Sequence, residues 1–156
     1  MGFDVCYFAD DFISFDQFLK MTAKAATIYD DKIVLETATM HMGDDGILYV
    51  KYHEDAEIEL EDAKKHIATA IQLSNGKPVP VLINAKGVNS NMSPEARKYF
   101  SESEDTRKYR KVLAVVVDSL ANRLVANFFI SFNKPSEPTK VFNDKGKAIE
   151  WLNQFL

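Results

Sequence analysis

One unbroken apolar run, Val112 to Val117 with the sequence VLAVVV, restricts the fold more than any other feature of the chain. A strand with one face in water alternates apolar and polar residues, and this run does not alternate. The run is also far too short to cross a membrane as a helix. It therefore predicts a strand covered on both faces, which is typical of the centre of a parallel sheet in an α/β protein.

Two β-rich segments precede this strand, at residues 32–42 and 47–53, with the sequence Gly-Asp-Asp-Gly between them at 43–46. Such segments around a Gly/Asp turn predict an antiparallel hairpin. With the turn at 43–46, we expect Met42 to lie opposite Ile47 and His41 to lie opposite Leu48.

Helical segments alternate with the remaining strands. A helix is expected from about Glu59 to Leu73, because its apolar residues recur every three or four positions. Further helices are expected from Ser93, over 120–132 and over 145–155, with strands at Pro80–Ile83 and Thr139–Phe142. The order, a hairpin and then α-β-α-β-α-β-α, predicts a mostly parallel sheet covered by helices, with an antiparallel strand from the N-terminal hairpin.

Composition narrows the class of protein. The chain has 156 residues, of which 46% are hydrophobic, so one domain with a substantial core is expected. The net charge of -4 argues against nucleic-acid binding, which needs a basic surface. Cys6 is the single cysteine and the N-terminus lacks a basic start, so we expect a cytoplasmic protein with no membrane span. Residues 1–31 are expected to form an N-terminal extension with one short helix.

A series of segments carries a family resemblance: DDGILYVKY, LEDAKKHIATAIQLSNGKPVPVLINAKGV, SPEARKYF, LAVVV, NRLVANFF, KPSEPTKVF and KAIEWLNQF occur in this order. In this respect residues 32–156 resemble a bacterial family of unknown function with the SpoIIAA-like, or STAS/SEC14-like, fold. The resemblance implies a STAS-like α/β domain. The best-known STAS proteins are antagonists of anti-sigma factors, which implies regulation by binding to another protein.

The STAS switch is a serine in a D-S-S-G motif at the start of the second helix. Here the aligned residues are Met92-Ser93-Pro94-Glu95, so only the serine matches. Ser93 is therefore a regulatory candidate, since a phosphate at a helix N-terminus gains from the helix dipole. The simpler interpretation is that Ser93 is an N-cap, which Pro94 after it favours.

No motif for catalysis, nucleotide binding or cofactor binding is present, so we expect no enzyme, no cofactor and no metal site. His41, His53 and His66 lack metal-ligand spacing and are expected to be exposed or half-buried. The basic residues between 97 and 111 alternate with acids, which favours a solvated helix and loop. This group consists of Arg97, Lys98, Arg107, Lys108, Arg110 and Lys111.

The predicted helix at 120–132 is apolar on more than one face. A helix of this kind is buried all round or meets a partner or ligand as well as its own sheet. The candidate interface or cavity residues are Leu124, Phe128, Phe129 and Phe132. Two functions follow. The first is a non-enzymatic interaction or regulatory module that binds a protein partner or a second copy as a homodimer. The second is a carrier of a small apolar ligand or lipid in a SEC14-like cavity.

Overall fold

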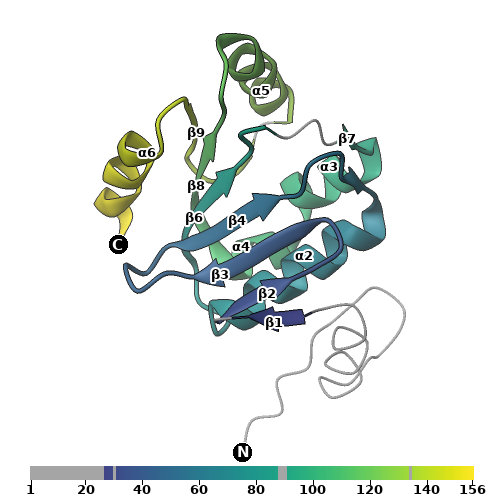
Figure 1. Ribbon diagram of the computed structural model, residues 1–156, viewed down its shortest axis with the longest axis vertical. Coiled ribbons are helices and arrows are strands. Elements are labelled where there is room, and N and C mark those ends of the chain that lie inside the picture. The colour runs from purple at the N-terminus through teal and green to yellow at the C-terminus, as the bar shows by residue number, and fades with distance from the viewer. Residues whose placement is uncertain (1–26, 30, 88–90, 134) are drawn as a thin grey trace, which may run out of the picture.

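A computed structural model of the chain describes residues 27–29, 31–87, 91–133 and 135–156 (Figure 1). Residues 27–29, 125 and 128–133 are described by their backbone alone. The segment expected to form a short helix within residues 1–31 lies mostly outside the described residues, and its last residues, Thr27 and Ile28, belong to a strand. The described sheet begins at Thr27, before the expected start of the domain at Lys32.

Seven strands form the main sheet in the order β1-β2-β3-β4-β6-β8-β9. The pairs β1–β2, β2–β3 and β3–β4 are antiparallel, whereas the pairs β4–β6, β6–β8 and β8–β9 are parallel. This confirms the predicted class, a mixed and mostly parallel α/β sheet with an antiparallel N-terminal part. The strands are β1 (Thr27–Tyr29), β2 (Lys32–Val34), β3 (Ala38–Met42), β4 (Leu48–Tyr52), β6 (Val79–Asn84), β8 (Arg110–Val116) and β9 (Thr139–Phe142).

The central strand β8 is covered on both faces, as its sequence predicts. Leu113 faces the core that β8 shares with β3, β4 and β6, whereas Val112, Ala114 and Val116 face the core beneath the C-terminal helix. The lack of alternation in this strand therefore follows from two apolar cores, one on each side of the sheet.

Three helices cover one face of the sheet: α2 (Leu60–Leu73), α3 (Pro94–Glu102) and α4 (Glu104–Tyr109). In Figure 1 they lie behind the strands. Successive parallel strands are added in one direction, and right-handed crossovers then place the connecting helices on one face. A short pair of parallel strands, β5 (Glu57–Ile58) and β7 (Asn91–Met92), precedes α2 and α3.

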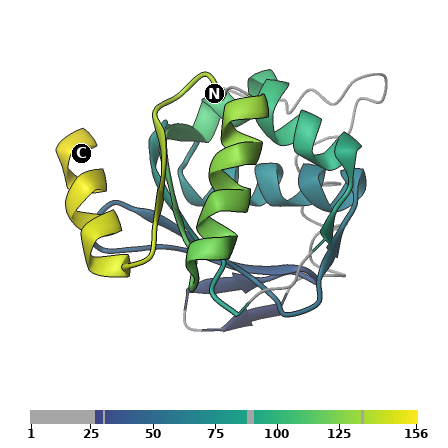
Figure 2. The same cartoon turned by 90° about the horizontal axis from the view of Figure 1, so that it is seen from above.

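The C-terminal helix α6 (Lys145–Leu152) packs on the opposite face, where Ala148 and Leu152 are buried against β6, β8 and β9. The 3₁₀ turn η1 (Asn153–Phe155) follows α6. Helix α5 (Leu120–Asn133) connects β8 to β9 and contacts β9 and α3. Figure 2 shows α6 and α5 at separate places on the sheet.

Two details of the hairpin region differ from the expectation. The segment 32–42 is two strands rather than one, because the chain turns back at residues 35–37, where the Leu35 N–H donates to the Ala38 carbonyl at 2.8 Å. The register of the β3–β4 hairpin is also shifted by one residue, so His41 lies opposite Tyr49 and Met42 opposite Leu48. The loop closes through the Gly43 N–H and the Ile47 carbonyl, 2.9 Å apart, and therefore includes Ile47.

Candidate functional site

Ser93 is the N-cap of α3. Its hydroxyl oxygen accepts a hydrogen bond from the Ala96 backbone N–H at 3.2 Å, and Pro94 occupies the first turn. The Ser93 backbone N–H donates to the Ile58 carbonyl at 3.0 Å, which fixes the chain before the helix. These contacts confirm the expected capping role. The regulatory role of Ser93 remains a prediction.

Ser93→Ala is expected to lower the free energy of unfolding by about 1 kcal/mol, because the Ala96 N–H loses its acceptor at the start of the helix. Urea unfolding followed by circular dichroism measures this change. Ser93→Asp keeps an acceptor at the cap and is the control, since it is expected to retain most of the stability. Equal losses in both variants would show that the hydroxyl does not act as the cap.

Helix α5 carries the four candidate interface or cavity residues. The Leu124 side chain is 62% exposed, and Leu120 one turn earlier is 71% exposed. Every side chain from Leu120 to Leu124 is exposed, so the first turns of α5 face solvent. The side chains of Phe128, Phe129 and Phe132 lie outside the described part, and their role in a cavity remains a prediction.

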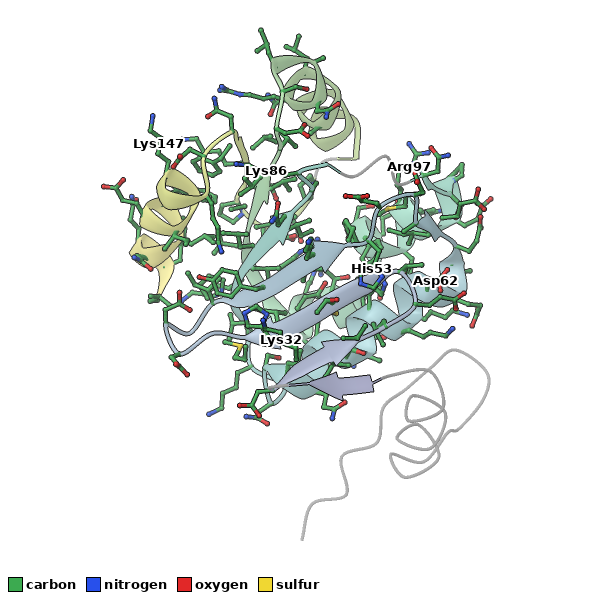
Figure 3. All side chains as sticks on the ribbon, viewed as in Figure 1. Lys32, His53, Asp62, Lys86, Arg97 and Lys147 are labelled. Atoms are coloured by element: carbon green, nitrogen blue, oxygen red, sulfur yellow. The ribbon has the colours of Figure 1, made fainter. Side chains whose placement is uncertain are left out.

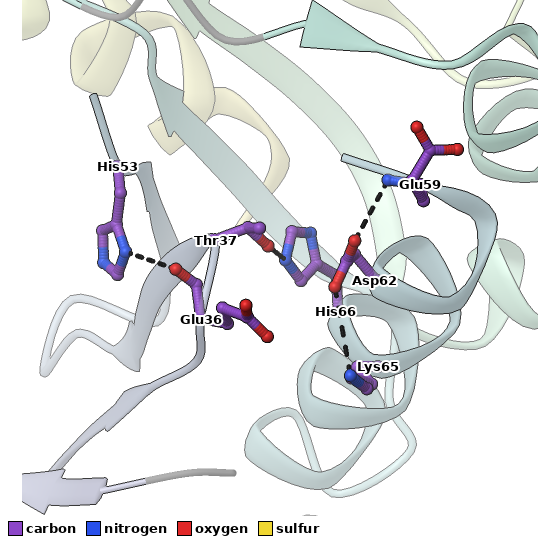
Figure 4. A network of polar contacts seen from close by, with 7 residues as sticks. All are labelled: Glu36, Thr37, His53, Glu59, Asp62, Lys65 and His66. Carbon is purple, nitrogen blue, oxygen red and sulfur yellow. Dashed lines mark hydrogen bonds and ion pairs between the residues drawn. The ribbon is translucent and has the colours of Figure 1, made fainter. Parts of the chain in front are cut away.

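His66 is buried, contrary to the expectation of an exposed or half-buried histidine. Only 2% of the residue is exposed, and its ring lies between Tyr52 and Phe100, with centroid distances of 5.8 and 6.0 Å. The His66 Nε2 and the Thr37 Oγ1 form a hydrogen bond of 2.7 Å (Figure 4). The His66 Nδ1 finds no hydrogen-bond partner within the described part of the chain.

The environment of His66 disfavours a charged ring. Burial is the main cause that lowers the pKa of His66 to about 4, and His53 and Lys65 lower it further, whereas Asp62 acts in the opposite direction. Asp62 is held by the start of α2, where it accepts from the Glu59 backbone N–H at 3.1 Å. The buried ring is therefore neutral at pH 7, and its contacts are those of a structural residue.

Arg110 and Glu137 form a buried ion pair that the sequence did not indicate. Arg110 Nε contacts Glu137 Oε1, and the Arg110 Nη2 donates to the Phe100 carbonyl at 2.9 Å. The side chains of Arg110 and Glu137 are 6% and 8% exposed. The expectation of a solvated basic group is therefore wrong for Arg110. The pair joins the start of β8 to the loop before β9 and to α3.

The described residues bring together no three His, Cys, Asp or Glu side chains that could hold a metal ion. Among these residues, no helix has both the length and the apolar character that crossing a bilayer requires. The buried His66 ring and the Arg110–Glu137 pair contact protein groups on several elements. They support the fold, and the exposed start of α5 is the described surface that matches a candidate site from the sequence.

Two bacterial proteins are among the solved structures that resemble the chain. One is an uncharacterized protein of the DUF3478 family with a SpoIIAA-like fold from Shewanella loihica PV-4. It is 17% identical, with 74% of this chain and 91% of that chain covered and a TM-score of 0.49. The other is a protein with unknown function from Arthrobacter sp. FB24. It is 24% identical, with 72% and 96% of the two chains covered and a TM-score of 0.26.

No curated protein matches the sequence of the chain. A family model, described as a domain of unknown function (DUF7793), matches residues 40–156, which include the last three residues of β3 and every described element from β4 to α6 and η1. The chain therefore belongs to the DUF7793 family.

Proposed function

We propose that this chain is a non-enzymatic interaction module that self-associates through the exposed face of α5. The observation that carries the proposal is the exposure of Leu120 and Leu124, at 71% and 62%, on adjacent turns of one helix. Residues four apart share one face of a helix, so the two side chains form a continuous apolar surface. Burying a leucine side chain stabilises a complex by about 1.5–3 kcal/mol, which favours covering this surface.

A second copy of the chain is the partner to which the proposal commits. Two copies related by a twofold axis present the same apolar surface to each other, which is the usual arrangement of homodimers. A stable dimer buries about 800 Å² on each partner, more than two leucines supply. Positions 128 and 132 continue the four-residue spacing of 120 and 124 with phenylalanine, so the sequence supplies further apolar area on α5.

Leu124→Asp is expected to raise the dimer dissociation constant at least about tenfold, because it places a charge in an apolar contact. Sedimentation velocity over a range of protein concentrations measures the change. Leu156→Asp is the matched control, since Leu156 is also 62% exposed but lies at the C-terminus rather than on α5. It is expected to leave the dissociation constant unchanged.

A wild-type chain that stays monomeric at concentrations of about 1 mM would contradict self-association, because even a weak specific contact populates a dimer there. The same holds if Leu156→Asp and Leu124→Asp weaken the dimer equally. Circular dichroism of both variants separates loss of association from loss of fold.

A further inference from the structure

One face of the antiparallel half of the sheet is left open by the described helices. Strands β2, β3 and β4 carry α2, α3 and α4 on the opposite face, and α6 covers the part of this face formed by β6, β8 and β9. Figure 1 shows the open face toward the viewer, and Figure 3 shows Lys32 and His53 on it. Its residues are Lys32, Val34, Thr39, His41, Tyr49 and Lys51, as the strand register requires.

A row of aromatic and basic side chains crosses this open face. His41 lies opposite Tyr49, and their rings stack with centroids 5.1 Å apart and an interplanar angle of 10°. Lys32 lies beside His41 on β2, because its neighbour Ile33 pairs with Met40. At the other end, the Lys145 Nζ lies 5.1 Å from the centre of the Tyr49 ring. The row is thus an aromatic pair with one lysine at each end.

Lys32 and Lys145 give this row a positive charge, whereas the whole chain has a net charge of -4. The acid beside it, Asp45, is already engaged, since it accepts from the Tyr49 hydroxyl at 2.6 Å and from the Ile47 backbone N–H at 3.1 Å. Burial lowers the pKa of His41, and Lys32 and Lys145 lower it further, against an opposing effect of Asp45. Both lysines therefore contribute a positive potential at the same ring.

From this geometry we propose that the open face binds an acidic segment of a partner protein, in which two carboxylates flank an aromatic side chain. Neighbouring strands are about 4.8 Å apart, so the row from Lys32 to Lys145 extends over about 14 Å. In an extended segment, residues i, i+2 and i+4 share one face over about 13 Å. The two acids then reach Lys32 and Lys145, while the aromatic residue between them lies over His41 and Tyr49. This surface is separate from α5 and goes beyond self-association.

The probe is the capped peptide acetyl-Asp-Ser-Phe-Ser-Asp-amide, added to the full chain and followed by NMR of the His41 ring. Binding is expected to shift this ring, to raise the pKa of His41 as the lysine charges are neutralised, and to weaken at high salt. The double variant Lys32→Gln/Lys145→Gln is expected to bind about tenfold more weakly, since two exposed ion pairs are lost. Lys98→Gln, on α3 at the other face, is the matched control and is expected to bind normally.

The proposal is overturned if the peptide leaves the His41 ring unchanged, or if Lys98→Gln weakens binding as much as the double variant. It is equally overturned if the neutral peptide acetyl-Asn-Ser-Phe-Ser-Asn-amide binds as tightly as the acidic one. An oligothymidylate that displaces the peptide and binds more tightly would assign the surface to nucleic acid instead. The dimer dissociation constant is measured on the same samples. A change in peptide binding without a change in this constant separates the open face from the α5 surface.

Discussion

Glu137→Ala is expected to lower the free energy of unfolding by about 3–5 kcal/mol, because it leaves the Arg110 guanidinium buried without its counter-charge. Among the described residues, the Arg110 guanidinium then keeps the hydrogen bond to the Phe100 carbonyl at 2.9 Å and its contact with the neutral Tyr109 side chain. A backbone carbonyl supplies a partial charge, which compensates a full positive charge only in part. The loss is therefore that of a broken buried ion pair rather than that of a surface contact.

Urea unfolding at pH 7 measures this loss. The matched control is Glu61→Ala, which removes an exposed ion pair with Lys64 whose atoms are 2.7 Å apart. Because that pair is screened by water, the control is expected to change the free energy of unfolding by less than about 1 kcal/mol. Equal losses at Glu137 and Glu61 would contradict the buried character of the Arg110–Glu137 pair.

A second variant separates the ion pair from the packing around it. Arg110→Met/Glu137→Leu replaces both charges by apolar groups, and such replacements are often neutral or stabilising. We expect this double variant to be more stable than Glu137→Ala. A double variant as unstable as Glu137→Ala would mean that the shape of the two side chains, and not the unpaired charge, accounts for the loss.

The order of the longer strands and helices could be predicted because it depends on local patterns, whereas the short elements β1, β5, β7 and α4 were not expected. The apolar run at 112–117 indicates a covered strand wherever its partners lie in the sequence. The start of α3 was likewise predictable, since Ser93 and Pro94 form a cap from neighbouring residues alone. These signals lie within a few residues of the structure that they determine.

The hairpin register is harder to predict, because it depends on how one loop closes. The Gly43 N–H donates to the Ile47 carbonyl, so the loop has one residue more than the Gly-Asp-Asp-Gly sequence indicates. A shift of one residue changes which side chains lie opposite each other. His41 therefore faces Tyr49 instead of Leu48, and this pair is the centre of the basic aromatic row.

The buried polar contacts could not be predicted, since each joins residues that are distant in the sequence. The apolar residues of α2 place His66 at the side of the apolar face. Only the contact with Thr37, 29 residues away in the sequence, shows that the His66 ring is buried in the protein. Arg110 stands among residues of mixed charge, and its partner Glu137 belongs to another loop. A single sequence carries no signal that brings such residues together.

His66 makes the stability of the protein dependent on pH. Its pKa is about 4 in the folded chain and about 6.5 in an unfolded one, so the unfolded state takes up the proton first. The contribution is fully present above pH 6.5 and is lost as the pH falls toward 4. Each pH unit in this window corresponds to about 1.4 kcal/mol, so the contribution of His66 to the free energy of unfolding is expected to fall by about 2 kcal/mol between pH 7 and 5.

Urea unfolding at half-unit intervals from pH 7 to 5 measures this dependence. His66→Gln removes the titrating ring, so its free energy of unfolding is expected to change by about 2 kcal/mol less over this range than that of the wild type. The comparison uses the slope of the free energy of unfolding against pH, and it holds even where the variant is less stable at every pH.

His53→Gln is the control, because it keeps His66 and removes a ring whose Thr39 contact lies on the open face of the sheet. This control is expected to keep most of the wild-type slope, because burial, and not His53, is the main cause of the lowered pKa of His66. A slope that disappears in His53→Gln and persists in His66→Gln would contradict the assignment, because the buried ring would then not be the group that takes up the proton.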